Sequence, residues 1–123
     1  MNILATDMDG TFLDHLGSYD KVRLDKLLDA CEAKNYVFTV ASGRSLLALE
    51  ELFDGFVDRI AIIAENGALV QYKGEVLFES KLEPKDYLEI ADTTSALPTC
   101  EGILLSGRRG AYAPEDADPA YLK

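Results

Sequence analysis

Three short apolar runs, each ending abruptly in a polar loop, constrain the fold of this chain more than any other feature. The runs cover residues 3–6, 36–41 and 60–64, and amphipathic stretches with apolar residues at helical spacing separate them. Buried strands alternating with helices predict an α/β fold with a parallel sheet. Because crossovers between parallel strands are right-handed, we expect the three polar loops to lie side by side at one edge of the sheet.

After the third loop the pattern changes from crossovers to hairpins. The predicted elements are a hairpin with strands 68–72 and 75–78, a helix over 82–97 with proline in its first turn, and a hairpin with strands 102–106 and 110–113. We therefore expect a domain boundary near Ser80, with residues 1–80 in the first domain and residues 81–123 beginning an α+β second domain. The acidic segment 114–123 is typical of a connection rather than an ending.

Composition narrows the classes of function. The chain has 22 Asp and Glu against 12 Lys and Arg, a formal net charge of -10 that would repel nucleic acids and anionic membranes. No segment is apolar for the roughly 18 residues that a membrane span needs, and the N-terminus lacks the basic start of a signal peptide. Cys31 and Cys100 match no metal-ligand spacing, which favours reduced thiols. We therefore expect a cytoplasmic protein that binds neither nucleic acid nor membrane.

Two carboxylates follow the first apolar run. Asp7 and Asp9 are separated by one residue, and Gly10 permits a tight turn after them. One carboxylate can attack phosphorus while a second carboxyl protonates the leaving oxygen, and Mg²⁺ would offset the charge repulsion. An isolated Asp-x-Asp is more often a solvated turn. A calcium loop is excluded, because Thr11 and Phe12 stand where that loop needs a ligand and a glycine.

The second and third loops carry further candidate residues. Ser42 and Gly43 offer a hydroxyl and backbone N–H groups to phosphate oxygens at the expected start of a helix, although Ser42 could merely cap that helix. Arg44 could orient a substrate by its charge or be solvated in the first helical turn. Asn66 could present its amide to a substrate or serve only the Asn-Gly turn.

In this order, the three loops resemble the haloacid dehalogenase superfamily of phosphohydrolases. Residues 7–11 are similar to its first motif, residues 41–44 to its second motif in the form used by the Cof-like sugar-phosphatase branch, and residues 65–68 to the third loop of that branch. The resemblance covers roughly the whole chain. It implies the N-terminal half of a Rossmann-like core followed by the start of a type IIB cap.

The resemblance also implies roles for the site residues. Asp7 would be the nucleophile and Asp9 the acid/base, and both would hold Mg²⁺, Asp9 through its backbone carbonyl. Ser42 would donate a hydrogen bond to the phosphoryl group. The implied substrate-binding set is Thr11, Ser42, Gly43, Arg44 and Asn66. The implied substrate is a small phosphorylated metabolite similar to a sugar phosphate.

Two parts of the family pattern are not recognisable. They are a lysine that neutralises the phosphoryl group and an acidic Gly-Asp loop that completes the magnesium site. The lysines after the third loop lie in the predicted hairpin, second domain and tail: Lys73, Lys81, Lys85 and Lys123. Two functions therefore stay open: a phosphatase whose remaining half lies outside this chain, or a non-catalytic phosphate-binding module.

The same resemblance predicts an exposed strand. In the resembled fold the first strand is central, with later strands on its other side. A chain of 123 residues would leave the edge of residues 3–6 open, and we expect it to self-associate through that edge, to retain the missing half as a separate chain, or to rearrange.

Overall fold

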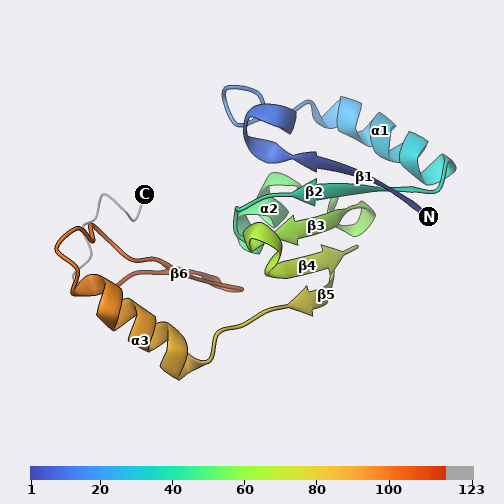
Figure 1. Ribbon diagram of the computed structural model, residues 1–123. Helices are drawn as coiled ribbons and strands as arrows, with labels where there is room; N and C mark the ends of the chain where they lie inside the picture. Colours follow the sequence, from blue (N-terminus) through green and yellow to red (C-terminus); the bar gives the residue numbers. More distant parts are fainter. Residues whose placement is uncertain (116–123) are drawn as a thin grey trace. The chain divides into compact units, whose positions relative to one another are not determined.

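The computed structural model describes residues 1–115, and the chain divides into two units, Met1–Ser80 and Lys81–Lys123 (Figure 1). Each unit is described by itself. Residues 116–123, which include Lys123 and most of the predicted connection, lie outside the described residues.

The first unit is built on one mixed sheet with the strand order β1-β2-β3-β4-β5. Its strands are β1 (Asn2–Asp7), β2 (Tyr36–Ala41), β3 (Ala61–Ala64), β4 (Leu69–Tyr72) and β5 (Glu75–Glu79). The first three run parallel, and β4 and β5 join them antiparallel. The predicted α/β fold is confirmed. The hairpin expected over 68–78 extends the same sheet, which is therefore mixed rather than wholly parallel.

Two helices connect the parallel strands. α1 (Lys21–Ala33) follows β1, and its N-cap Asp20 accepts a hydrogen bond from the Arg23 N–H at 3.0 Å. α2 (Leu46–Leu52) follows β2. Because both right-handed crossovers lead in the same direction across the sheet, the two helices pack against the same face. The single hydrophobic cluster of this unit draws buried side chains from both helices and from β2 and β3, including Leu28, Leu49, Val40 and Ile62.

Met8 attaches the first loop to this cluster. Its side chain is fully buried, whereas Asp7 and Asp9 on either side are exposed. The turn Met8–Phe12 bends at Gly10, which has a positive φ of 76°. The buried methionine therefore fixes where the two carboxylates leave β1.

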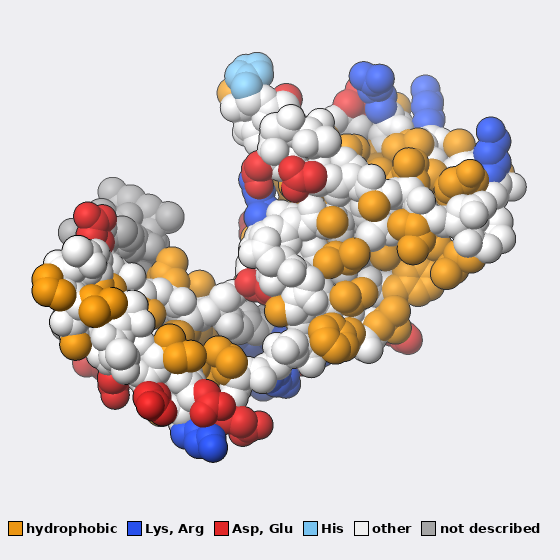
Figure 2. Space-filling view, in the orientation of Figure 1, with side chains coloured by type: hydrophobic (Ala, Val, Ile, Leu, Met, Phe, Trp, Pro, Cys, Tyr) orange, Lys and Arg blue, Asp and Glu red, His pale blue; other side chains and the backbone are white. Residues whose placement is uncertain are grey.

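β1 is the edge strand of the sheet within residues 1–115. Ile3 is 65% exposed and Leu4 41% exposed, although they point to opposite faces of the strand. Figure 2 shows hydrophobic side chains spread over the face of this unit that the view presents. The expectation that the first strand has an open edge is confirmed for the described residues.

The second unit contains α3 (Pro84–Ser95) and a hairpin of β6 (Leu105–Gly107) and β7 (Gly110–Tyr112). Pro84 lies in the first turn of α3, as predicted. The predicted strand 102–106 was placed too early. The strand pairing places Leu105 opposite Tyr112. If the pairing continued to earlier residues, Ile103 would lie opposite Pro114, which has no N–H to donate.

Within residues 1–115 no helix is long and apolar enough to cross a bilayer. Cys31, which is buried, and Cys100 are both free thiols.

Candidate functional site

A cavity of about 410 Å³ opens where β1, β2 and β3 end. Its lining residues are Asp7, Ala41, Ser42, Gly43, Ile63, Asn66 and Gly67. Each of the three polar loops contributes residues to this lining. The prediction that Asp7, Ser42 and Asn66 lie close together is therefore confirmed. Parallel strands explain this convergence, because their carboxyl ends share one edge of the sheet.

Backbone hydrogen bonds tie the second and third loops into one unit. The Ser42 N–H donates to the Ile63 carbonyl at 2.9 Å, the Asn66 N–H to the Ser42 carbonyl at 3.2 Å, and the Glu65 N–H to the Arg44 carbonyl at 3.0 Å. These bonds continue the pairing of β2 with β3 past the ends of the strands. The position of Asn66 therefore depends on the backbone of residues 42–44.

The third loop adopts an uncommon backbone conformation. Glu65 and Asn66 have positive φ values of 52° and 54°, followed by 96° at Gly67. Non-glycine residues rarely adopt this region, and such conformations cluster at functional sites. The turn ends β3 and reverses the chain into β4.

This turn brings the Asn66 carboxamide against Gly43. A Cβ atom at position 43 would lie 2.9 Å from Asn66 Oδ1 and 3.2 Å from Asn66 Nδ2. Glycine is therefore needed at position 43 for close approach. The sequence predicted only phosphate binding for Gly43, because nothing in a single sequence pairs residues that are 23 positions apart.

The second loop differs from the prediction in one respect. α2 begins at Leu46, and its N-cap is Ser45, whose Oγ accepts a hydrogen bond from the Ala48 N–H at 3.2 Å. Ser42 therefore does not cap the helix, and Gly43 and Arg44 lie in the loop before it rather than in its first turn. Instead, Ser42 Oγ accepts a hydrogen bond from the Arg44 N–H at 3.2 Å, which leaves the hydroxyl proton as a donor.

The two carboxylates of the first loop have different surroundings. Asp7 lines the cavity, and the Thr11 hydroxyl lies 3.5 Å from its Oδ2. Asp9 does not line the cavity, and its side chain is 64% exposed. Arg44 Nε donates to Asp9 Oδ2 at 3.1 Å and Arg44 Nη2 to Asp9 Oδ1 at 2.5 Å. Neither Thr11 nor Arg44 lines the cavity.

This ion pair changes the protonation of both partners. The hydrogen bonds from Arg44 lower the pKa of Asp9, and the same bonds raise the pKa of Arg44. Asp9 is therefore ionised near neutral pH in this arrangement. An ionised carboxylate fits the part of a base that activates water, whereas protonation of a leaving group needs the acid form.

The cavity has negative charge and no cation of its own. Asp7 is the only ionisable residue among those that line it. A phosphate dianion entering beside this carboxylate would be repelled unless a cation were bound. Carboxylate and carbonyl oxygens are hard donors that suit Mg²⁺. In the described part of the chain, however, no group of three or more His, Cys, Asp or Glu side chains is placed to hold a metal ion.

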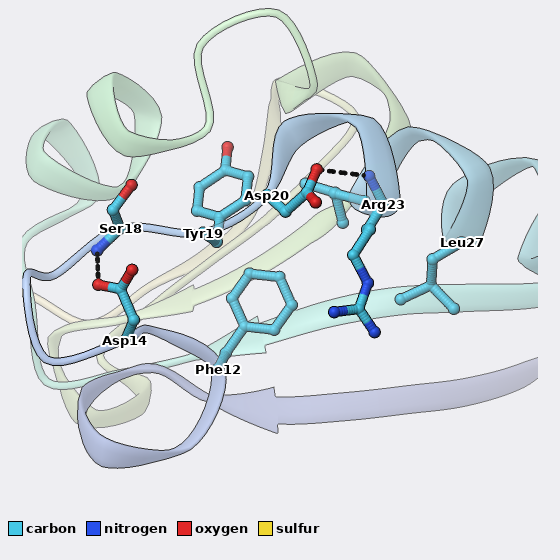
Figure 3. A pocket seen from close by; sticks show the side chains of 8 residues that line it. Phe12, Asp14, Ser18, Tyr19, Asp20, Arg23 and Leu27 are labelled. Atoms are coloured by element: carbon cyan, nitrogen blue, oxygen red, sulfur yellow. Dashed lines mark hydrogen bonds between the residues drawn. The ribbon is translucent and has the colours of Figure 1, made fainter.

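A second cavity, of about 460 Å³, lies beside the N-terminal end of α1 (Figure 3). Two of its acidic side chains serve local structure: Asp14 Oδ1 accepts the N–H groups of Leu16 and Ser18, and Asp20 caps α1. Phe12 and Tyr19 form its aromatic wall, with ring centroids 5.4 Å apart. No predicted site residue lines this cavity, so we place the candidate site in the smaller one.

Comparison with known proteins agrees with the arrangement of the loops. A family model described as haloacid dehalogenase-like hydrolase matches residues 4–122. The 5-amino-6-(5-phospho-D-ribitylamino)uracil phosphatase YbjI of Escherichia coli (strain K12) is 30% identical over 120 residues, which are 98% of this chain and 44% of that protein.

Solved structures give the same result for the fold. SMU.1108c from Streptococcus mutans UA159 matches with a TM-score of 0.87 at 29% identity, over 98% of this chain and 46% of that one. A sugar phosphatase described as subclass IIB of the superfamily matches with a TM-score of 0.64 at 21% identity, over 90% of this chain and 43% of that one, which shows likeness of fold alone. The chain spans less than half the length of each of these proteins.

Proposed function

Because the chain belongs to the haloacid dehalogenase-like hydrolase family and spans less than half the length of its relatives, we propose that it is the N-terminal part of a Cof-like, type IIB member and supplies the nucleophile and phosphate-binding loops of a phosphatase. Residues 1–80 would be the first half of the catalytic core, and residues 81–123 the beginning of the cap. The rest of the active site would come from residues outside this chain.

The observation that carries the proposal is the cavity at the ends of β1, β2 and β3. It holds a carboxylate, a hydroxyl and a carboxamide from three loops: Asp7, Ser42 and Asn66. A phosphate group needs both an attacking oxygen and hydrogen-bond donors at one place. Each of these groups is present in the lining.

In the proposed reaction Asp7 attacks phosphorus and forms an aspartyl phosphate. Because Arg44 keeps Asp9 ionised near neutral pH, Asp9 must first take up a proton from solvent; it then gives this proton to the leaving oxygen and later takes one from the water that hydrolyses the intermediate. The Ser42 hydroxyl, whose oxygen already accepts the Arg44 N–H, donates its own proton to a phosphoryl oxygen. Gly43 and Asn66 would bind the phosphate from the same side. Thr11 would support Asp7.

A magnesium ion fits part of this site. The Asp7 carboxylate and the Asp9 backbone carbonyl would hold it, since Arg44 occupies the Asp9 carboxylate. When bound, the ion would offset the charge of the phosphate beside Asp7 and polarise the phosphorus–oxygen bonds. An octahedral site needs more ligands than these two, and we propose that waters and residues outside this chain provide them.

The relatives suggest a substrate class. The Escherichia coli relative is named as a phosphatase of a phosphorylated ribitylamino-uracil. We propose that this chain also serves a small phosphorylated metabolite, in the cytoplasm and without nucleic acid or membrane partners.

A second candidate function is phosphate binding without turnover. It is favoured by the lack of a cation in the cavity lining and of a metal-ligand cluster in residues 1–115. On this reading the three loops bind phosphate but residues 1–123 alone do not hydrolyse esters.

The test is phosphate release from p-nitrophenyl phosphate, with and without Mg²⁺. Residues 1–123 would be assayed alone and fused to the part of the Escherichia coli relative that follows its matched segment. We expect magnesium-dependent release from the fusion and far slower release from the chain alone.

Asp7→Asn should abolish phosphate release, and no covalent phosphoryl adduct should form on residue 7. The reason is that an amide is nearly isosteric with a carboxylate but cannot form the intermediate. Asp9→Asn should lower the rate by about 10²–10⁴-fold.

Asp58→Asn is the matched control, because it makes the same change at an exposed aspartate outside the cavity. Circular dichroism checks that each variant folds. Wild-type release from an Asp7→Asn fusion would overturn the nucleophile assignment. A folded fusion that binds inorganic phosphate but never releases it from an ester would favour the binding module.

A further inference from the structure

Arg44 connects all three loops of the candidate site. Its guanidinium binds the Asp9 carboxylate in the first loop through two hydrogen bonds. Its backbone N–H donates to Ser42 Oγ in the second loop, and its carbonyl accepts the Glu65 N–H from the third. The chain brings these partners together only on folding, because Asp9 and Arg44 are 35 positions apart.

The contact with Asp9 fixes a direction as well as a distance. Two parallel N–H donors on a planar guanidinium hold both oxygens of a carboxylate and so set the plane of the group, which a single ammonium donor cannot do. The Asp9 side chain is 64% exposed, so packing does little to restrain it. The Arg44 side chain is more sheltered, at 35% exposed, and its backbone is held at both its N–H and its carbonyl.

We propose that Arg44 is a positioning residue: it holds the Asp9 carboxylate in one orientation relative to Asp7 and Ser42 rather than binding the substrate itself. The inference rests on the proposed function, in which Asp9 is the acid/base. It also differs from the role that the sequence predicted for Arg44, because Arg44 lies outside the cavity lining and its guanidinium is already bound.

The competing interpretation is an ordinary exposed ion pair. Such pairs often contribute little to stability and restrain their side chains weakly. The two interpretations differ in what happens to Asp9 when Arg44 is replaced. If Arg44 positions Asp9, the carboxylate should lose its preferred rotamer while the fold stays intact.

The first test uses NMR on residues 1–123 and needs no enzymatic activity. Three-bond couplings between Hα and Hβ report the χ1 rotamer of Asp9. We expect one rotamer in the wild type, averaged couplings in Arg44→Gln and an intermediate pattern in Arg44→Lys, which keeps the charge but loses the two-pronged geometry. Arg59→Gln is the matched control: it removes the charge of another arginine bound to carboxylates, and it should leave the Asp9 couplings unchanged.

The second test measures the kinetics of the fusion protein with p-nitrophenyl phosphate. Arg44→Gln should lower kcat by about tenfold or more with little change in KM. In an Asp9→Asn background the same substitution should have no further effect, because Arg44 acts through Asp9.

A single Asp9 rotamer that persists in Arg44→Gln would overturn the proposal, as would a raised KM with unchanged kcat or a full additional loss in the Asp9→Asn background. Retained activity in Asp7→Asn would instead overturn the proposed function. The NMR result on Arg44 would still stand in that case, so the two failures are distinguishable.

Discussion

Gly43 and Asn66 lie in different loops, yet the Asn66 carboxamide occupies the space where a side chain at position 43 would begin. The contact joins the two loops on the side that lines the cavity, close to Asp7. Asn66 is also held by its own N–H, which donates to the Ser42 carbonyl. The direction of its side chain therefore depends on the absence of a Cβ atom at residue 43.

We predict that Gly43→Ala will move the Asn66 carboxamide without unfolding the protein. The clash at 2.9 Å involves the end of a side chain, which can rotate away, so the free energy of unfolding should fall by less than about 1 kcal/mol. Phosphate release from the fusion should fall by roughly tenfold, because a displaced binding group costs transition-state contacts. The measurements are urea unfolding, the side-chain NH₂ resonances of Asn66 and the rate.

Gly107→Ala is the control for this substitution. Gly107 also lacks a positive φ, and a Cβ atom there would meet its nearest neighbours at an ordinary 3.7 Å. Unchanged Asn66 resonances in Gly43→Ala would contradict the prediction.

At the scale of elements, one arginine joins α1 to the segment before β3. Arg59 belongs to the turn Val57–Arg59, and its three guanidinium nitrogens bind carboxylates of α1: Asp25 at 2.7 Å, Asp29 at 2.7 Å and Glu32 at 2.8 Å. These acids share one face of the helix, since they are spaced by four and three positions. The hydrogen bonds to Glu32, Asp29 and Asp25 raise the pKa of Arg59. Without Arg59, the three negative charges would repel one another.

We predict that Arg59→Gln will lower the free energy of unfolding by about 1 kcal/mol. The estimate is modest because the three carboxylates are 54–70% exposed, and water and salt screen exposed pairs. Urea unfolding at low and high sodium chloride would measure it, and the difference from wild type should shrink as salt rises. Lys26→Gln removes the same charge from an exposed position of α1 and should have a smaller effect. A loss that does not depend on salt would show that Arg59 acts through packing.

The parallel strands could be predicted from the sequence, whereas the contacts between loops could not. β2 matches the predicted range, β1 extends the predicted run 3–6 by one residue at each end, and β3 starts one residue later than predicted. An apolar run that stops at a polar residue marks a strand by composition alone. The start of α2 was misjudged, because Ser42 and Ser45 are both good N-cap residues and tertiary packing decides between them.

Pairs that are distant in sequence leave no such signal. The bond between Arg44 and Asp9 and the contact between Gly43 and Asn66 depend on the register of strands that a single sequence does not specify. For this reason the sequence predicted a set of site residues, but it did not predict that Asp9 lies outside the cavity.

At the scale of the whole chain, the exposed edge of β1 decides how residues 1–123 should behave in solution. The strand has apolar side chains on both faces, and within residues 1–115 its backbone pairs on one side only. An open, apolar strand edge is a template for pairing with another chain. We therefore expect concentration-dependent self-association through β1.

We predict that Ile3→Lys will weaken this self-association, because a charge on an edge strand disfavours strand addition. Sedimentation velocity over a range of concentrations would measure it. Val22→Lys is the matched control, since Val22 is also 65% exposed but belongs to the helix α1 rather than to a strand. A wild-type chain that stays monomeric at high concentration, or equal effects of the two substitutions, would contradict the role of β1.

The register of β1 has a further consequence for the order in which the chain can fold during synthesis. Asn2 pairs with Tyr36 and Asp7 with Ala41, so 34 positions separate the partners, whereas Ala64 and Leu69 of the β3–β4 turn are only 5 positions apart. Closing the longer loop costs ~1.7 kcal/mol more chain entropy. β1 leaves the ribosome before its partner β2, and it cannot complete this pairing until residue 41 has emerged. Asp7 reaches its place beside Ser42 only at that moment.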